Sequence, residues 1–197
     1  MEVEIEAKWL DVNHDAFREL LVSLGAIQVK KQTDMVRATF DLPGRRSNQE
    51  WVRVRDEGDK ITLSYKRHDN HGLTGTKEII LKVGDFAGMV EFLEATGFRK
   101  KSLQETRRES WTLDGAEIEL DEWPWLPTFV EVETKTELEM LQIIKKLGLD
   151  LNNAMYSSVD LVYARYYDVT PEEVNEWPDI RFSEVPRWLE EKRRPAK

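Results

Sequence analysis

The stretch EVEIEAKW, residues 2–9, decides how this chain is expected to fold. Its charged positions are Glu2, Glu4, Glu6 and Lys8, and its apolar positions are Val3, Ile5, Ala7 and Trp9. Alternation with a period of two residues predicts a β-strand with one face in hydrocarbon and one face against a polar surrounding. The rest of the sequence has to show whether that polar surrounding is water or a cationic partner.

Composition narrows the class of protein. The 197 residues can bury a sizeable core and are expected to form one main domain. Cysteine is absent, so a metal ion would need oxygen or histidine ligands rather than thiolates. The chain has 38 Asp and Glu residues but only His14, His68 and His71, so oxygen ligands are expected. We expect all three His on the surface.

Charge and hydropathy exclude several partners. A formal net charge of −9 argues against broad nucleic-acid binding, which relies on clustered Lys and Arg. A small polyanion remains possible where the sign of the charge reverses locally or where metal ions bridge acid to acid. No apolar run predicts a membrane span or a signal peptide, so we expect a cytoplasmic monomer or homodimer without membrane contact.

Helical and strand patterns alternate along the chain. Amphipathic helices ending near glycine are predicted at 13–26, 85–98 and 136–148. Strands are predicted at about 27–40, 77–83, 102–113, 116–123 and 129–133, with a hairpin over 50–67 that turns at residues 57–59. The segment 159–174 fits either a helix or a strand.

Charged side chains alternate with apolar ones in several of these strands. In WVRVR (51–55), Val52 and Val54 oppose Arg53 and Arg55, and in AEIELDE (116–122) the acidic residues oppose Ile118. One interpretation turns the polar face of an antiparallel sheet to water. The other places the helices on the apolar outside of a closed sheet, around a wet charged interior in which cations and anions compensate one another.

An ordered series of motifs resembles the CYTH superfamily, also called triphosphate tunnel metalloenzymes. The first-strand ExExK motif is matched by Glu4, Glu6 and Lys8. The later matches are FDLP (40–43), WVRVR (51–55), LSYK (63–66), TKE (76–78), RRESW (107–111), IELD (118–121) and VEVE (130–133). The resemblance covers residues 1–165 and leaves 166–197 as a C-terminal tail that we expect to pack on the main domain, anchored by Trp177 and Trp188.

The resemblance implies an α+β fold: a closed eight-stranded antiparallel β-barrel that forms a tunnel, with amphipathic helices packed outside. It implies metal ligands at Glu4, Glu6, Glu119, Asp121, Glu131 and Glu133. It implies substrate-binding residues at Lys8, Arg37, Arg53, Arg55, Lys66 and Arg108. Among these, Lys8, Lys66 and Glu6 are the candidates for catalysis. Arg108 is preferred to Arg107 by its distance from Trp111, and Ile80 departs from a Glu-x-Glu pattern that begins at Glu78.

These residue types suit phosphate chemistry. Guanidinium groups are bidentate donors to phosphate oxygens, and Mg²⁺ or Mn²⁺ takes hard oxygen ligands. The leading hypothesis is therefore a metal-dependent hydrolase of inorganic triphosphate or a small organic triphosphate. A class IV adenylyl cyclase, which converts ATP to cyclic AMP and pyrophosphate, and a noncatalytic polyphosphate or nucleotide binder are the alternatives.

Overall fold

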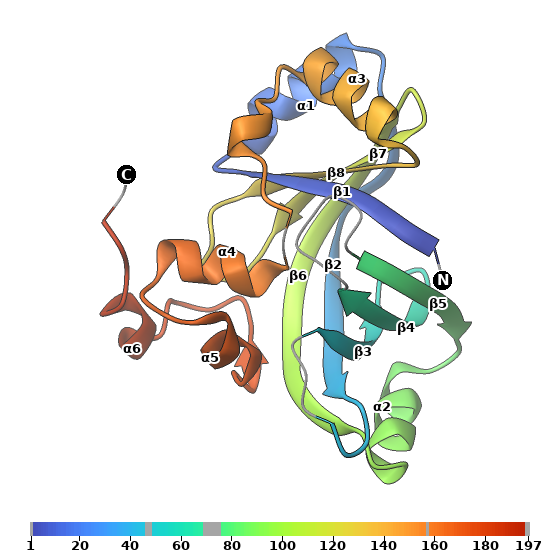
Figure 1. Cartoon of the computed structure of the whole chain (residues 1–197), viewed down its shortest axis with the longest axis vertical. Helices are drawn as coiled ribbons and strands as arrows, with labels where there is room; N and C mark the ends of the chain where they lie inside the picture. The colour runs from blue at the N-terminus through green and yellow to red at the C-terminus, as the bar shows by residue number, and fades with distance from the viewer. Residues whose placement is uncertain (1, 46–48, 69–75, 157, 196–197) are drawn as a thin grey trace.

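The computed structural model describes residues 2–45, 49–68, 76–156 and 158–195 (Figure 1). The side chains of residues 2–4, 68 and 76 are outside that description. The sequence predictions for the Glu4 side chain and for His68 and His71 therefore fall outside the described residues. Within the described residues, no helix has the length and apolar character needed to cross a membrane.

Within the described residues the chain forms one curled, mainly antiparallel sheet and six α-helices, as the α+β prediction requires (Figure 1). The strands are β1 (Glu2–Leu10), β2 (Ile27–Asp41), β3 (Glu50–Asp56), β4 (Ile61–His68), β5 (Thr76–Val83), β6 (Arg99–Leu113), β7 (Ala116–Glu122), β8 (Phe129–Thr134) and β9 (Asp179–Ile180). The helices are α1 (His14–Ser23), α2 (Phe86–Ala95), α3 (Glu137–Leu147), α4 (Val159–Tyr166), α5 (Pro171–Asn175) and α6 (Arg187–Glu190), with a 3₁₀ turn η1 (Leu151–Asn153).

Hydrogen-bonded neighbours in the sheet follow the order β2-β3-β4-β5-β1-β8-β7-β6-β9. The long strand β6 pairs with β2 as well as with β7, over registers that run from Ile27↔Thr112 to Asp41↔Arg99. The pairing of β1 with β5 is short and extends only from Glu2↔Glu78 to Glu4↔Thr76. The short β9 pairs with β6 in parallel, whereas the other strand pairs of the described residues are antiparallel.

The apolar face of the sheet points outward and is covered by helices. Ile5, Ala7 and Trp9 of β1 belong to a buried cluster that includes Phe17 of α1 and Met140 of α3. The charged residues that alternate with these three along β1 point to the inside of the curled sheet. The polar face of the sheet is therefore not its open outer face, in contrast to the interpretation in which that face meets water. The sequence alternative with helices outside and charges inside is the one that the structure has.

Other helices cover further parts of the outer face, although Ile79 and Leu81 of β5 stay exposed. Leu93 of α2 packs with Val52 and Val54 of β3 in a second core cluster. The C-terminal elements α4, α5 and α6 form a third cluster with residues that follow β7 and begin β8. Its fully buried members are Tyr163, Tyr167, Ile180 and Leu189. The segment 159–174, which the sequence left open, is helical in α4 and α5.

The C-terminal tail packs on the main domain through aromatic contacts. Trp177 meets Trp125, Tyr163 and Trp188 edge to face, with ring centroids 6.3, 5.3 and 5.1 Å away. Such pairs add to the stabilisation that burial of the rings provides. Trp188 keeps 48% of its surface exposed, so Trp177 is the more central of the two.

The prediction of a surface position is wrong for His14. This residue is buried at the start of α1, and its Nε2 donates to the carbonyl oxygen of Phe129 at 3.0 Å. A buried imidazole is stable here because its hydrogen bond is made to a backbone acceptor. The acceptor lies in β8, far along the chain, so local sequence carries no signal for it.

Candidate functional site

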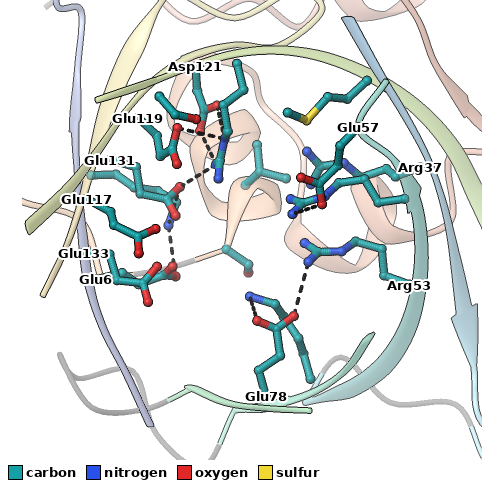
Figure 2. Close-up of a pocket in the computed structure, with 18 of the residues that line it drawn as sticks. Glu6, Arg37, Arg53, Glu57, Glu78, Glu117, Glu119, Asp121, Glu131 and Glu133 are labelled. Atoms are coloured by element: carbon teal, nitrogen blue, oxygen red, sulfur yellow. Dashed lines mark hydrogen bonds and ion pairs between the residues drawn. The ribbon is translucent and has the colours of Figure 1, made fainter. Parts of the chain in front are cut away.

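The curled sheet surrounds a pocket of about 1530 Å³ whose lining is dominated by charged side chains (Figure 2). Acidic residues gather on one side of it, and Arg37 and Arg53 face them from the other side (Figure 2). We call Glu6, Glu119, Asp121, Glu131 and Glu133 the acidic wall; they lie on β1, β7 and β8. We call Arg37, Arg53, Arg55 and Lys66 the basic wall; they lie on β2, β3 and β4.

Strand register brings the acidic wall together. Glu6 of β1 is directly opposite Glu133 of β8, and Glu131 of β8 is opposite Glu119 of β7. Side chains opposite each other on antiparallel strands have Cβ atoms about 5 Å apart, and like charges there repel. The acidic wall therefore needs cations nearby to offset the repulsion between its carboxylates.

Two cations of the chain reach into this wall. Arg108 of β6 contacts Asp121 with two hydrogen bonds, Nε to Oδ1 at 2.7 Å and Nη2 to Oδ2 at 2.6 Å, and contacts Glu131 at 3.3 Å. Lys8 of β1 lies 3.1 Å from Glu6 and 3.4 Å from Glu131. Burial favours the neutral form of Glu131, but Lys8 and Arg108 outweigh it and hold the pKa of this carboxyl well below its usual value.

Two other carboxyls of the acidic wall lack this compensation. Burial raises the pKa of Glu119 to about 7 against the partial opposition of Arg108, whose nearest atom is 4.0 Å away. Burial also raises the pKa of Glu133 to about 7, and the charges of Glu131 and Glu6 add to the effect. The buried Oε2 of Glu119 has no hydrogen-bond partner among the described residues. Both carboxyls would bind a cation readily.

The basic wall is held in place by acids of its own. Arg53 contacts Glu78 of β5 at 3.2 Å, and Lys66 contacts the other oxygen of the same carboxylate at 3.4 Å. Arg55 donates to Glu57 through both Nε and Nη2, at 2.9 and 2.7 Å. These contacts fix the direction of the cationic side chains into the pocket before any ligand arrives.

Arg37 is the least compensated residue of the basic wall. Its side chain lies 4.5 Å from the ring centroid of Trp123 and donates to Thr106 at 3.0 Å, while its buried Nε has no hydrogen-bond partner in the described chain. Burial lowers the pKa of Arg37 well below the usual arginine value, and the charges of Arg53 and Arg55 lower it further. An anion that reached these three guanidinium groups would relieve their mutual repulsion.

The structure places nearly all the sequence-predicted site residues around one pocket. Those lining it are Glu6, Lys8, Arg37, Arg53, Arg55, Lys66, Arg108, Glu119, Asp121, Glu131 and Glu133. The Glu4 side chain is outside the described residues. Arg107 instead points away and contacts Asp34, Glu122 and the ring of Phe182, so the choice of Arg108 agrees with the structure. Ile80 lines the pocket and is 54% exposed.

Sequence reasoning missed several pocket residues, among them Glu57, Trp123 and Lys101. Glu57, predicted only as part of a turn, is buried and accepts hydrogen bonds from Arg55 and from the Thr62 hydroxyl. Trp123 lies against Arg37 at the start of the connector after β7. Lys101 of β6 lines the pocket beside Asp41, although strict alternation would turn it outward.

The acidic wall fits a hard divalent cation by its chemistry. No group of three or more His, Cys, Asp or Glu side chains in the described ranges already has the arrangement of a metal site. The donor set is nevertheless all carboxylate, which suits Mg²⁺ or Mn²⁺. Oε2 of Glu119 has no hydrogen-bond partner among the described residues, and the charges of Glu131 and Glu6 add to the effect of burial in raising the pKa of Glu133, so a cation bound here would relieve both.

Three features together define a class of protein: a curled antiparallel sheet, helices on its apolar outer face, and a pocket with oppositely charged walls. The model of the CYTH domain matches residues 2–167, and the chain belongs to this family. A search of curated proteins finds no match.

Solved structures share the fold. A conserved hypothetical protein from Pyrococcus furiosus is 20% identical over 79% of this chain and 96% of its own, with a TM-score of 0.67. An adenylate cyclase candidate from Vibrio parahaemolyticus is 16% identical over 83% of this chain and 98% of its own, with a TM-score of 0.69. The Hippeastrum protein HpAC1, an adenylyl cyclase candidate with a dominant triphosphatase activity, is 18% identical over 80% and 91% of the two chains, with a TM-score of 0.55.

Proposed function

We propose that this protein hydrolyses a triphosphate-containing compound, inorganic triphosphate or a small organic triphosphate, with the help of Mg²⁺ or Mn²⁺. The observation that carries the proposal is the division of one pocket into an acidic wall and a basic wall (Figure 2). A phosphate chain between them would meet cations of the protein on one side and carboxylates suited to a metal ion on the other.

The basic wall supplies the phosphate contacts. Arg37, Arg53 and Arg55 present planar donors that match phosphate oxygens better than ammonium groups do. Their side chains are buried or nearly so, and hydrogen bonds there lose little strength to competing water. Lys8 and Arg108 approach from the side of the acidic wall, so a bound phosphate chain would have donors on both sides.

The acidic wall would hold the metal ion. Glu6, Glu119, Glu131 and Glu133 offer the oxygens, while Asp121 is already engaged by Arg108. When bound, such an ion neutralises phosphate charge and lowers the pKa of a bound water. In the overall reaction, water adds to the terminal phosphorus, the bond to the bridging oxygen breaks, and orthophosphate separates from a diphosphate product.

We also propose that the curled sheet closes into a tunnel. The supporting observation is the long pairing of β6 with β2, which joins the two ends of the eight-strand order that starts at β2 and finishes at β6. A closed wall would exclude bulk water along the sides of the pocket and strengthen its electrostatic contacts.

Phosphate release tests the proposal. The full chain is incubated with tripolyphosphate, ATP or thiamine triphosphate, in Mg²⁺, Mn²⁺ or EDTA. We expect orthophosphate release from at least one of these compounds with either metal and none in EDTA. Cyclic AMP and pyrophosphate from ATP would replace the proposal with a cyclase, and tight binding without any turnover would replace it with a binding protein.

A further inference from the structure

A β-bulge in β6 turns one lysine into the pocket. Ser102 is opposite Thr39 of β2, but the next pair along the strands is Lys100 with Phe40, so Lys101 is an extra residue. A bulge of this kind reverses the side to which the following side chains point. Lys101 therefore lines the pocket, although it would otherwise share the outer face with Leu103 and Arg107.

The Lys101 side chain is buried, and its ammonium group makes no hydrogen bond to the described residues. Its side chain is 4% exposed, and its Nζ lies 3.6 Å from Oδ1 of Asp41, beyond hydrogen-bond distance. Nothing else in the described part of the chain accepts a hydrogen bond from it. A buried ammonium group has three donors, and leaving them unsatisfied is unfavourable. Because Lys101 lines the pocket, water or a bound anion there can accept these hydrogen bonds.

Asp41 does not depend on Lys101 for its charge compensation. Arg99 donates to Oδ2 of Asp41 through both Nε and Nη2, at 2.9 and 2.5 Å, and Arg99 is held in turn by Glu176 after α5. Oδ1 of Asp41, which faces Lys101, is buried without a hydrogen bond among the described residues. The carboxylate therefore orients Lys101 across a gap and leaves its donors available.

Lys101 extends the basic wall by one strand. Thr39 of β2 pairs with Arg53 of β3 on one side and with Ser102 of β6 on the other. Adjacent strands are about 4.8 Å apart, so the backbones at Arg53 and Lys101 are separated by roughly 10 Å. Side chains of this length span such a distance and can contact one phosphate chain between them.

We propose that Lys101 contacts the phosphate chain of the substrate, as a cation that the bulge and Asp41 direct into the pocket. This inference rests on the proposed function. Asp41 and Arg99 act as positioning residues, and Glu176 connects this arrangement to the C-terminal segment, which lies beyond the part that the family model matches.

Binding of tripolyphosphate tests the inference, measured by calorimetry on the full chain in EDTA and again in Mg²⁺. We expect Lys101→Met to weaken binding about tenfold or more, the usual effect of losing a charge-assisted hydrogen bond. The neighbouring Lys100 is 44% exposed and contacts Glu94, so Lys100→Met is the matched control and should stay within twofold of the wild type. Lys101→Arg should keep most of the affinity.

A double variant separates contact with the substrate from a structural role. If Lys101 only neutralised Asp41, the pair Asp41→Asn and Lys101→Met would restore the affinity. We expect binding by the double variant to stay at least tenfold weak, and its melting temperature to stay below that of the wild type because Asp41→Asn also weakens the acceptor of Arg99. The double variant remains informative if Lys101→Met alone does not fold. Equal affinity in Lys101→Met and Lys100→Met, or recovered affinity in the double variant, would overturn the inference. A wild-type chain that binds none of tripolyphosphate, ATP and thiamine triphosphate, with or without Mg²⁺, would overturn the proposed function itself.

Discussion

Replacing Glu119 by Gln should stabilise the metal-free protein at pH 8. The folded protein raises the pKa of this carboxyl from 4.5 to about 7, chiefly by burial. At about 1.4 kcal/mol for each tenfold change, the ionised carboxylate at pH 8 costs the folded state at most about 3 kcal/mol. Water in the pocket reduces this penalty, so we expect a gain of about 1–3 kcal/mol in the free energy of unfolding. The melting temperature should rise by about 3–10 °C.

The gain in stability should increase with pH, because the pKa of Glu119 is raised in the folded protein. Below pH 4.5 the Glu119 carboxyl is protonated in both states and the substitution changes little; the penalty grows as the pH rises and is complete above about pH 7. Thermal melts in EDTA at pH 5 and pH 8 measure this difference. Glu91→Gln, at an exposed position of α2 away from the pocket, removes the same formal charge and is the control. A Glu119→Gln variant that melts at or below the control at pH 8 would refute the reasoning.

Three further predictions concern the walls and the tail. Glu6→Gln should reduce metal-supported phosphate release at least about a hundredfold while the melt in EDTA stays at or above that of the wild type; unchanged turnover would contradict the assignment of Glu6 as a ligand. Arg53→Ala should raise the KM for tripolyphosphate about tenfold or more, whereas Arg107→Ala, on the outer face, should not. Trp177→Ala should lower the melting temperature by about 4–8 °C, for a loss of about 2 kcal/mol, and leave the KM unchanged below the melt.

The sequence predicted the composition of both walls because side chains alternate strictly along a regular strand. Once Trp9 was assigned to the apolar face, the direction of Lys8 followed, and the same rule separated Arg108 from Arg107. The three amphipathic helices had no apolar surface available except the outside of the sheet. That requirement made a charged interior as acceptable as a polar face in water, and the ordered series of motifs then favoured the charged interior.

What the sequence did not predict lies where alternation fails or where partners are distant in the chain. Lys101 points inward because one extra residue interrupts the pairing of β6 with β2, and no residue type announces that bulge. Glu57 follows the end of β3, where the turn and not the strand sets the direction of its side chain. His14 is buried because a carbonyl more than a hundred residues away accepts its hydrogen bond.

The central claim is that the two walls bind opposite charges of one metal–triphosphate complex. A crystal structure with Mn²⁺ and a triphosphate analogue that resists hydrolysis tests it most directly, because anomalous scattering locates the metal independently. The account predicts a Mn²⁺ peak among the carboxylates of Glu6, Glu119, Glu131 and Glu133, and phosphates against Arg37, Arg53 and Arg55. An analogue bound outside the pocket, or Mn²⁺ bound away from the acidic wall, would contradict it.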